Sequence, residues 1–345
     1  MREVIIMAPL ILLLMLPARS AAQPGSVPDR RPIGEIEFFG YKGLDVAHIR
    51  AALPFHEGDL FPPQNSDDDP ALRINQSIRE TLGRDATDVN VVCCDGRQFL
   101  MIYIGLPGAS SRAVALNRAP TGPARLPADI MELNGQLLDA WMKGVFRGNA
   151  TEDRSQGFSL LADPDARAIQ LKLRSYAPNH ERDIRRVLAT SGDARHRAAA
   201  AMTLGYVRAS VTQVNALVDA CFDADGSVRN NAVRALDVLF EARGDLAKRV
   251  RIDRFIPLLT SGQWTDHNKV IHLVEILTRP RNPQVLASIR AGALENLVEM
   301  ARWRSEHAWD ARLVLGRVAG IDETRLQELT HQGPVDEIIS AASAH

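Results

Sequence analysis

The sequence predicts a multidomain protein in which a small α+β domain precedes an all-α solenoid. Two observations carry this prediction. A helical pattern at residues 197–204 returns at residues 229–236, so that Leu204 of one copy corresponds to Leu236 of the next, 32 residues on. A repeat of that length is typical of stacked helix pairs. Upstream, two β-rich segments, 89–94 and 97–106, flank Asp95-Gly96, a dipeptide that favours a tight hairpin.

The composition is that of an ordinary globular protein. Its 345 residues are enough for two or three domains, and 46% of them are hydrophobic. The formal net charge is −1, so no overall positive field attracts nucleic acid, and we exclude nucleic acid as a partner. Three cysteines are too few for a disulfide framework, so we expect Cys93, Cys94 and Cys221 to be buried thiols.

Residues 1–22 have the pattern of a secretory signal peptide. Arg2 precedes an apolar run at residues 4–16, and Ser20 and Ala22 provide the small residues of a cleavage site. The run is shorter than the ~20 residues that a membrane-spanning helix needs. We therefore expect an exported protein, periplasmic or secreted. The alternative is an uncleaved anchor, which would keep the chain close to a membrane.

A linker at residues 23–32 leads into an α+β domain at residues 33–107. Residues 33–40 alternate as a strand does, and Asp45 is a suitable N-cap for the helix that follows it. A second helix begins at Pro70 and ends at Gly83. With the hairpin, the expected order is β-α-α-β-β.

The hairpin has one apolar face, which the two helices are expected to cover. A two-residue turn at Asp95-Gly96 would pair Val91 with Leu100. Val89, Val91 and Cys93 then share the covered face. Cys94 is expected to face away from it and to react with a thiol reagent before Cys93.

This domain resembles a POTRA domain. The resemblance rests on Ile36-x-Phe38-x-Gly40, on Asp45-x-x-x-Ile49-x-x-x-Leu53, on Gly58 and on the order of the elements. It implies that the domain binds polypeptides by strand addition at an edge of its sheet, often in the assembly of outer-membrane proteins. The alternative is an unrelated small α+β domain with the same order of elements.

Residues 108–163 are expected to form a second linker and one amphipathic helix. Residues 107–127 are rich in proline and glycine, whereas residues 126–146 place Ile130, Leu137 and Trp141 on one helical stripe. Two short antiparallel helices, 164–176 and 181–189, should then meet around Pro178 and cap the solenoid.

The solenoid is expected to span residues 164–333, with a frayed tail at residues 334–345. Its predicted helix pairs are 195–207 with 211–222, 228–242 with 248–260, 268–277 with 283–303, and a fourth that starts near 311–316 and ends with 323–330. These pairs resemble HEAT-like repeats, the closest match being Asp225-x-Ser227-Val228-Arg229-x-x-Ala232-x-x-Ala235-Leu236. In this pattern the aspartate caps the first helix, and small alanines allow the helices to approach closely.

The HEAT resemblance implies a protein-binding scaffold whose second helices line a concave face. Some relatives of such repeats are phycobilin lyases, so an enzyme or enzyme subunit is an alternative. No catalytic motif is present. His267, His272 and Glu275 are too few to predict a metal site, and Asp67-Asp68-Asp69 is interpreted as a solvated loop. We expect no catalytic residue, cofactor or metal.

The sequence therefore predicts an exported, non-enzymatic adaptor that binds a protein or peptide. A component of envelope assembly is a further alternative. The candidate partner-binding residues are a basic cluster and three tryptophans, Arg182, Arg185, Arg186, Trp264, Trp303 and Trp309. For the arginines a solvated helix face is the alternative, and for the tryptophans it is the core between repeats.

Overall fold

The computed structural model describes residues 31–62, 69–149 and 151–344. The predicted signal peptide, most of the first linker, Asp67 and Asp68 lie outside this part of the chain. The described residues form two compact units. Unit 1 comprises residues 115–149, 151–251 and 272–279, and unit 2 comprises residues 31–62, 69–114, 252–271 and 280–344.

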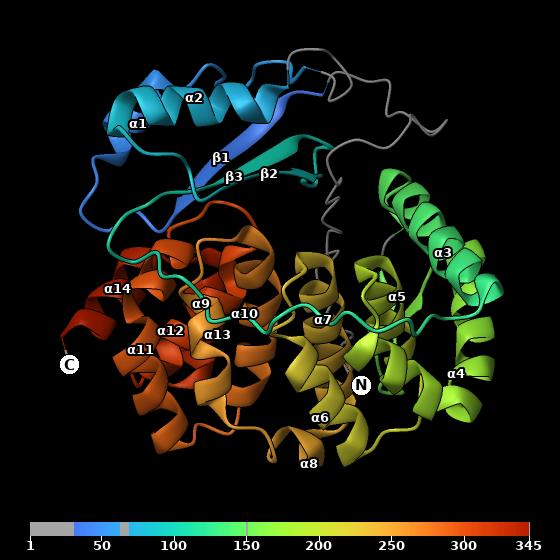
Figure 1. Ribbon diagram of the computed structural model, residues 1–345. Helices are drawn as coiled ribbons and strands as arrows, with labels where there is room; N and C mark the ends of the chain where they lie inside the picture. Colours follow the sequence, from blue (N-terminus) through green and yellow to red (C-terminus); the bar gives the residue numbers. More distant parts are fainter. Residues whose placement is uncertain (1–30, 63–68, 150, 345) are drawn as a thin grey trace. The chain divides into compact units, whose positions relative to one another are not determined.

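Unit 2 contains a mixed three-stranded sheet in the order β1-β3-β2, drawn in blue and teal in Figure 1. Its strands are β1 (Ile33–Phe39), β2 (Asp88–Cys93) and β3 (Leu100–Gly105). β3 runs parallel to β1 and antiparallel to β2. The helices α1 (Val46–Ala52) and α2 (Pro70–Leu82) follow β1, so the predicted β-α-α-β-β order is confirmed.

The two helices bury one face of the sheet. Asp45 caps α1 by accepting a hydrogen bond from the His48 N–H, and Asp69 caps α2 in the same way at Ala71. Between sheet and helices lies a core of apolar side chains, among them Ile36, Phe38, Ile49, Ile74, Ile78, Ile102 and Ile104. Alternate strand residues face this core, as the sequence predicted.

The register of the hairpin differs from the prediction by two residues. Val91 pairs with Ile102, not with Leu100. The turn is longer because the Asp95 carboxylate accepts hydrogen bonds from the Arg97 and Phe99 N–H groups, which organises a wider loop. A shift of two residues keeps every side chain on its predicted face.

The cysteines differ from the prediction as well. Cys93 and Cys94 are joined in a disulfide, so neither is a free thiol that could react with a labelling reagent. Side-chain alternation alone does not reveal a covalent bond between neighbours. Cys221 is a buried free cysteine, as predicted.

The other face of the sheet is covered by helical residues of unit 2, chiefly α11 and the side chains of Trp264 and Trp303. The helices on this side are η1 (Ile252–Arg254), α9 (Ile256–Leu259), the start of α10 (Trp264–Thr278), α11 (Pro283–Ala301), α12 (Ala308–Val318), α13 (Glu323–Gln332) and α14 (Val335–Ser343). The Trp303 indole N–H donates to the Phe38 carbonyl over 2.9 Å, and the Gly40 N–H donates to the Glu299 carboxylate over 2.7 Å. The sheet is therefore buried on both sides.

Two helix predictions in this region were wrong. The segment 248–260 is not one helix, because Pro257 lacks an N–H and is accepted only in the first turn of the short α9. The predicted frayed tail is the helix α14. Its residues Ile338, Ile339 and Ala342 are buried. Packing of these side chains against the rest of the fold stabilises a helix that the local sequence alone did not predict.

Unit 1 is mainly helical. It contains α3 (Ala128–Phe146), a small hairpin of β4 (Glu152–Asp153) and β5 (Leu160–Leu161), α4 (Pro164–Thr190), α5 (Ala194–Leu204), α6 (Val211–Ala220), α7 (Gly226–Ala242), α8 (Gly244–Ala247) and the end of α10. No helix in the described residues of either unit is long and apolar enough to span a membrane.

The repeated motif builds equivalent corners in unit 1. Asp193 caps α5 and Asp225 caps α7, as predicted. The arginine of each copy closes the corner beside it: Arg197 donates to the Ser191 carbonyl and Arg229 to the Asp223 carbonyl, each at 3.0 Å. Arg197 also donates two hydrogen bonds to the Asp223 carboxylate, at 2.8 and 2.7 Å, and so links one corner to the next. The first helices α5 and α7 then pack side by side.

The two short helices expected around Pro178 are one continuous helix, α4. Its buried stripe includes Leu173, Ala177, Ile184 and Leu188 and passes Pro178 at unbroken helical spacing. Packing of this stripe against α5 outweighs the roughly 3 kcal/mol that an interior proline costs.

The predicted linker at residues 107–127 contains no helix and follows a defined path. In unit 2, the Arg112 N–H donates to the Thr260 carbonyl over 2.7 Å. In unit 1, the Asn117 N–H donates to Phe222 and the Gly122 N–H to Thr190. The segment is therefore held by backbone hydrogen bonds at several points, and its Ser110 and Leu126 side chains are buried as well.

Candidate functional site

The sheet of unit 2 can meet a partner only at its edges, because helices cover both of its faces. The outer edge of β1 is closed. The Ile33 N–H donates to the Asp59 carbonyl at 2.9 Å, and the Gly58 N–H donates to the Ile33 carbonyl at 2.8 Å. Further along, the Glu57 carboxylate accepts from the Ile36 N–H, and the Arg50 guanidinium donates to the Ile36 carbonyl. The backbone of β1 is thus already satisfied by its own domain.

The outer edge of β2 is paired differently. Within the described residues, β2 is the last strand of the sheet, and no strand pairs with its outer side. Five of its six residues are only partly buried. It also lacks lysine, arginine and proline, the residues that usually protect an edge strand from pairing.

The hydrogen-bond pattern shows which peptide groups of β2 face outward. The Leu100 N–H donates to the Pro32 carbonyl beside β1, so even-numbered residues of β3 face β1. The odd-numbered residues Met101 and Tyr103 therefore face β2, opposite Val92 and Asn90. By alternation, the N–H and C=O groups of Val89 and Val91 point away from the sheet.

An apolar band runs beside this edge on the helix side. Leu82, Ala86, Val89 and Val91 are partly buried and pack against the core between the sheet and α2. A strand added to β2 would place every second side chain against this band. The arrangement can therefore bind an extended polypeptide through its backbone and favour apolar residues at alternate positions.

Trp264 and Trp303, two of the predicted partner-binding residues, are not on a surface. Trp264 is 0% exposed and Trp303 is 2% exposed. Both pack on Tyr103 of β3, whose ring lies 3.6 Å from Trp264 and 5.3 Å from Trp303 between centroids. Their role is to join the sheet to the helices of unit 2. The nearly unbroken apolar sequence of β3 was the signal that both faces of this strand are buried.

The other predicted residues do not join them. Trp309 is half-buried and packs edge-on against His331. The three arginines lie on α4 in unit 1, where Arg185 pairs with Glu181 at 3.3 Å and Arg186 pairs with Asp183 at 3.0 Å. Arg182 is exposed. These nearby carboxylates cancel most of the positive field of the cluster.

A buried ionic network, which the sequence did not predict, lies in unit 1. The Glu152 carboxylate accepts hydrogen bonds from Arg154, from Arg234 and from the Ser159 hydroxyl. Arg154 also donates to Asp237 over 2.8 Å. Two positive and two negative groups alternate, so the network is balanced. Burial opposes the charge of Glu152, but the two guanidinium groups lower its pKa to about 2.

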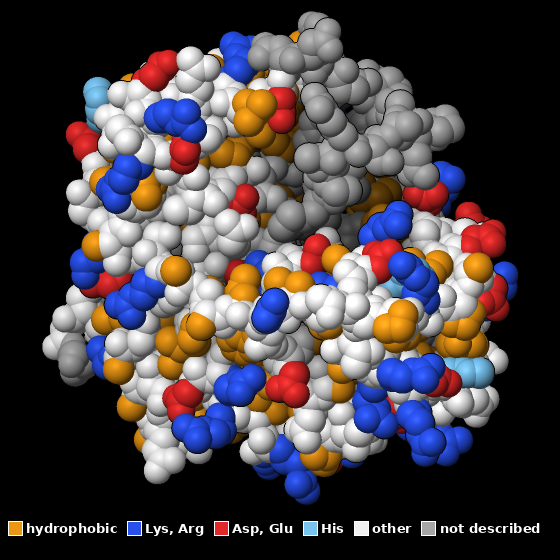
Figure 2. Space-filling model, in the orientation of Figure 1, with side chains coloured by type: hydrophobic (Ala, Val, Ile, Leu, Met, Phe, Trp, Pro, Cys, Tyr) orange, Lys and Arg blue, Asp and Glu red, His pale blue; other side chains and the backbone are white. Residues whose placement is uncertain are grey.

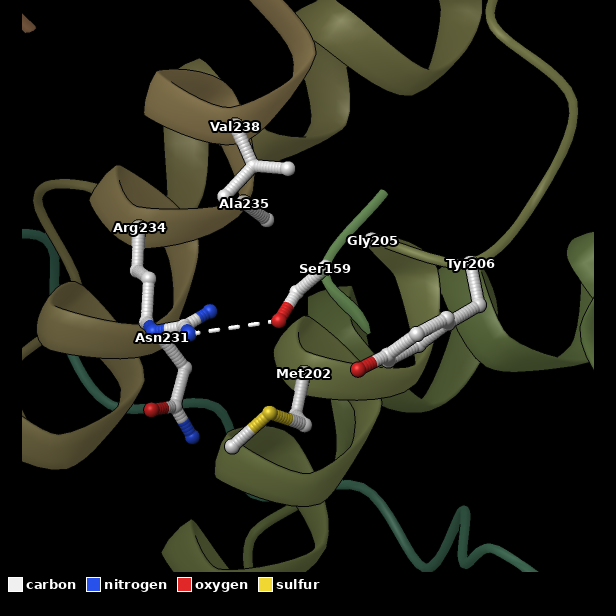
Figure 3. A pocket seen from close by; sticks show the side chains of 8 residues that line it. All are labelled: Ser159, Met202, Gly205, Tyr206, Asn231, Arg234, Ala235 and Val238. Carbon is white, nitrogen blue, oxygen red and sulfur yellow. Dashed lines mark hydrogen bonds between the residues drawn. The ribbon is translucent and has the colours of Figure 1, made fainter. Parts of the chain in front are cut away.

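Figure 3 shows the small pocket that borders this network. Arg234 points toward the Ser159 hydroxyl, and the Tyr206 ring lies on the opposite side of that hydroxyl. Burial raises the pKa of Tyr206 to about 12. Glu152 and Tyr206 thus have pKa values far from neutrality in opposite directions, which suits a structural network better than proton transfer. The network anchors the β4–β5 hairpin to α7.

A second buried polar group lies under the sheet in unit 2. The His267 ring is fully buried, donates through Nε2–H to the Ser261 carbonyl and lies 4.7 Å from the Phe39 ring. Burial lowers the pKa of His267 to about 4. Nearby, burial raises the pKa of Asp88 to about 6, although its carboxylate accepts a hydrogen bond from the Trp264 N–H.

We expect His267 to make the fold sensitive to acid. Its pKa is about 4 in the folded state and ~6.5 in the unfolded state. The neutral ring therefore contributes stability that is complete above pH ~6.5 and is lost as the pH falls toward 4. The loss at pH 4 should approach 3 kcal/mol, on the order of 1.4 kcal/mol per pKa unit. Urea unfolding of the wild type and of His267→Gln at several pH values measures it, with a flatter profile expected for the variant.

Asp88 opposes this effect and provides the control. Because its pKa is raised in the folded state, its contribution is complete below pH ~3.8 and is lost as the pH rises through about 6. In the Asp88→Asn variant the free energy of unfolding should therefore decrease more steeply with falling pH than in the wild type, because the opposing contribution of Asp88 is absent. Identical pH profiles for wild type and His267→Gln would contradict the assignment.

Comparison of the chain with protein-family models finds no matching family, and comparison with curated proteins finds no matching relative. Within the described residues, no group of three or more histidine, cysteine, aspartate or glutamate side chains is arranged to hold a metal ion.

Proposed function

We propose that this protein is an exported adaptor that binds an extended segment of another polypeptide by strand addition at the outer edge of β2. The observation that carries the proposal is the difference between the two edges of the sheet among the described residues. The domain's own residues close the edge of β1, while the outer edge of β2 pairs with no strand and presents the peptide group of Val91.

The resemblances to known domains and the disulfide support the same proposal. The β-α-α-β-β order and the sheet order β1-β3-β2 are those expected if the domain is POTRA-like. The Asp-capped pairs of helices in unit 1 are those expected of HEAT-like repeats. A disulfide between Cys93 and Cys94 suits an oxidising compartment, in agreement with the signal-peptide pattern.

The helical surface gives less support to a binding groove than the sheet edge does. The large apolar side chains of unit 1 that are more than a third exposed are Leu116, Leu138, Leu171 and Val211, and each belongs to a different segment. On the face in Figure 2, isolated apolar side chains are interspersed with charged ones of both signs. We therefore assign partner binding to the sheet edge and a scaffolding role to the helices.

Substitution of one backbone donor tests the proposal. Val91→Pro removes an N–H that faces outward and leaves the ladder to β3 intact, since proline is tolerated on edge strands in this orientation. Peptides of ten residues selected from a random displayed library for binding to the wild type serve as probes. Loss of the donor and the clash with the proline ring should weaken their binding tenfold or more, roughly 1.4 kcal/mol. Isothermal calorimetry measures the affinity.

Val91→Ala is the matched control, because it trims the same side chain and keeps the N–H. We expect it to bind the selected peptides within about threefold of the wild type. Protection of the Val91 amide from hydrogen exchange should appear only with peptide bound. A library that yields no binder, or peptides that bind Val91→Pro as well as the wild type, would refute strand addition at β2.

A further inference from the structure

The Cys93–Cys94 disulfide lies at the end of the open edge strand. β2 ends at Cys93, which pairs with Leu100. Cys93 is partly exposed, whereas Cys94 is 7% exposed. The Arg31 guanidinium donates to Cys94 Sγ over 3.6 Å and to the Gln98 carbonyl over 3.1 Å. Cys93 is therefore the more exposed residue of the pair, and a cation lies beside Cys94.

This disulfide does not hold distant parts of the chain together. A crosslink stabilises a fold mainly by closing a loop of the unfolded chain, and the effect grows with the length of that loop. A bond between neighbours closes no such loop. Reducing this disulfide would detach no element from the fold. Stabilisation of the folded state therefore does not explain why the bond is present.

The bond does limit the length of β2. Successive residues of a strand point to opposite faces of the sheet, so two neighbours whose sulfur atoms are joined cannot both follow the strand. The ladder accordingly stops at the pair of Cys93 with Leu100. If the register continued, the next pair would be Cys94 with Phe99. The backbone instead resumes with a hydrogen bond from the Asp95 N–H to the Phe99 carbonyl.

We propose that Cys93–Cys94 is a redox-responsive site that is reduced by dithiols and that its reduction lengthens the β2 edge by the pair of Cys94 with Phe99. The part of this inference that concerns partner binding rests on the proposed function, whereas the reduction and the longer ladder do not.

The exchange reaction follows from the positions of the two sulfur atoms. A thiolate of the dithiol attacks Sγ of Cys93, the more exposed residue, and forms a mixed disulfide there while Cys94 leaves as a thiolate. The Arg31 guanidinium stabilises that leaving thiolate, which takes up a proton. The second thiol of the reductant then attacks the mixed disulfide. Cys93 leaves as a thiol and the reductant is oxidised to a cyclic disulfide, so that two electrons and two protons pass to the protein.

Reduction under native conditions tests the chemistry. Dithiothreitol is added to the folded Cys221→Ala protein, and aliquots are alkylated with N-ethylmaleimide and weighed by intact mass spectrometry. We expect no label before reduction and two labels after it. Arg31→Gln should slow the reaction roughly three- to tenfold, and Arg31→Lys should restore the rate, because leaving-group stabilisation requires a cation. Arg97→Gln, which removes a loop arginine that pairs with Asp95, should leave the rate unchanged.

Hydrogen exchange tests the structural consequence. Reduction should increase protection of the Cys94 amide in the wild type. The double variant Cys93→Ser/Cys94→Ser should show that protection with or without reductant. A protein that takes up no label while folded, or a reduced protein whose exchange at the Cys94 amide is unchanged, would overturn the inference. Peptide affinity is a separate readout. Failure of all peptides to bind in either redox state would refute strand addition and leave the redox site intact.

Discussion

Replacing Trp264 by alanine is expected to lower the free energy of unfolding by roughly 3–5 kcal/mol. Its indole is 0% exposed, stacks on Tyr103 at an interplanar angle of 16° and also contacts the Trp303 ring. The substitution leaves a cavity between the sheet and the helices, and the surrounding rings cannot collapse into it without losing their own contacts. Urea unfolding followed by circular dichroism measures the change.

Trp309→Ala is the control for this prediction. The same side chain is removed there, but Trp309 is half-buried and packs against His331 at the edge of unit 2. We expect a loss of no more than about 2 kcal/mol at this position, because less apolar area leaves water. Equal losses of unfolding free energy in the two variants would show that the aromatic cluster stabilises unit 2 no more than a half-buried tryptophan does.

Glu152→Ala should cost about 3–5 kcal/mol, because it leaves buried guanidinium groups without the carboxylate that balances them. Arg234 is 5% exposed, and its ring contact with Trp141 at 4.1 Å does not replace a carboxylate. Arg154 would keep Asp237 as its partner. Equilibrium unfolding in guanidinium chloride at constant ionic strength, adjusted with sodium chloride, measures the loss of stability.

The double variant Glu152→Leu/Arg234→Met separates charge from packing. It removes one positive and one negative group and leaves the Arg154–Asp237 pair, so we expect it to be more stable than Glu152→Ala by about 2 kcal/mol. Glu295→Ala breaks an exposed pair with Lys42 and should cost less than about 1 kcal/mol. A double variant as unstable as the single one would show that the carboxylate acts through shape and not through charge.

Features that depend on neighbouring residues were predictable from the sequence. Asp193 and Asp225 each cap a helix because their side chains reach backbone N–H groups two or three residues away. The two faces of the hairpin followed from alternation alone. Such signals are contained in a short window of sequence, and they gave the order of elements in the α+β domain correctly.

Features that depend on distant residues were not predictable in this way. Pro178 was expected to break a helix, and only packing of α4 against α5 explains why it does not. Glu152 and Arg234 are 82 residues apart, so their pairing left no local pattern. The burial of Trp264 and Trp303 required knowing that a strand of the N-terminal domain would pack over them. The sequence led us to expect strand addition at an edge of the sheet, but it did not show which of the two edges would be closed.

Both faces of the β1–β3 sheet are completed by segments from opposite ends of the chain. The Phe38 carbonyl accepts its hydrogen bond from Trp303, which is 265 residues away, and Gly40 donates to Glu299, which is 259 residues away. During synthesis the N-terminal domain emerges long before the helices that cover it. Until those helices follow, Tyr103 and Phe39 remain exposed and the domain lacks half of its core. A chain built in this way stays incompletely folded until its last quarter has been made.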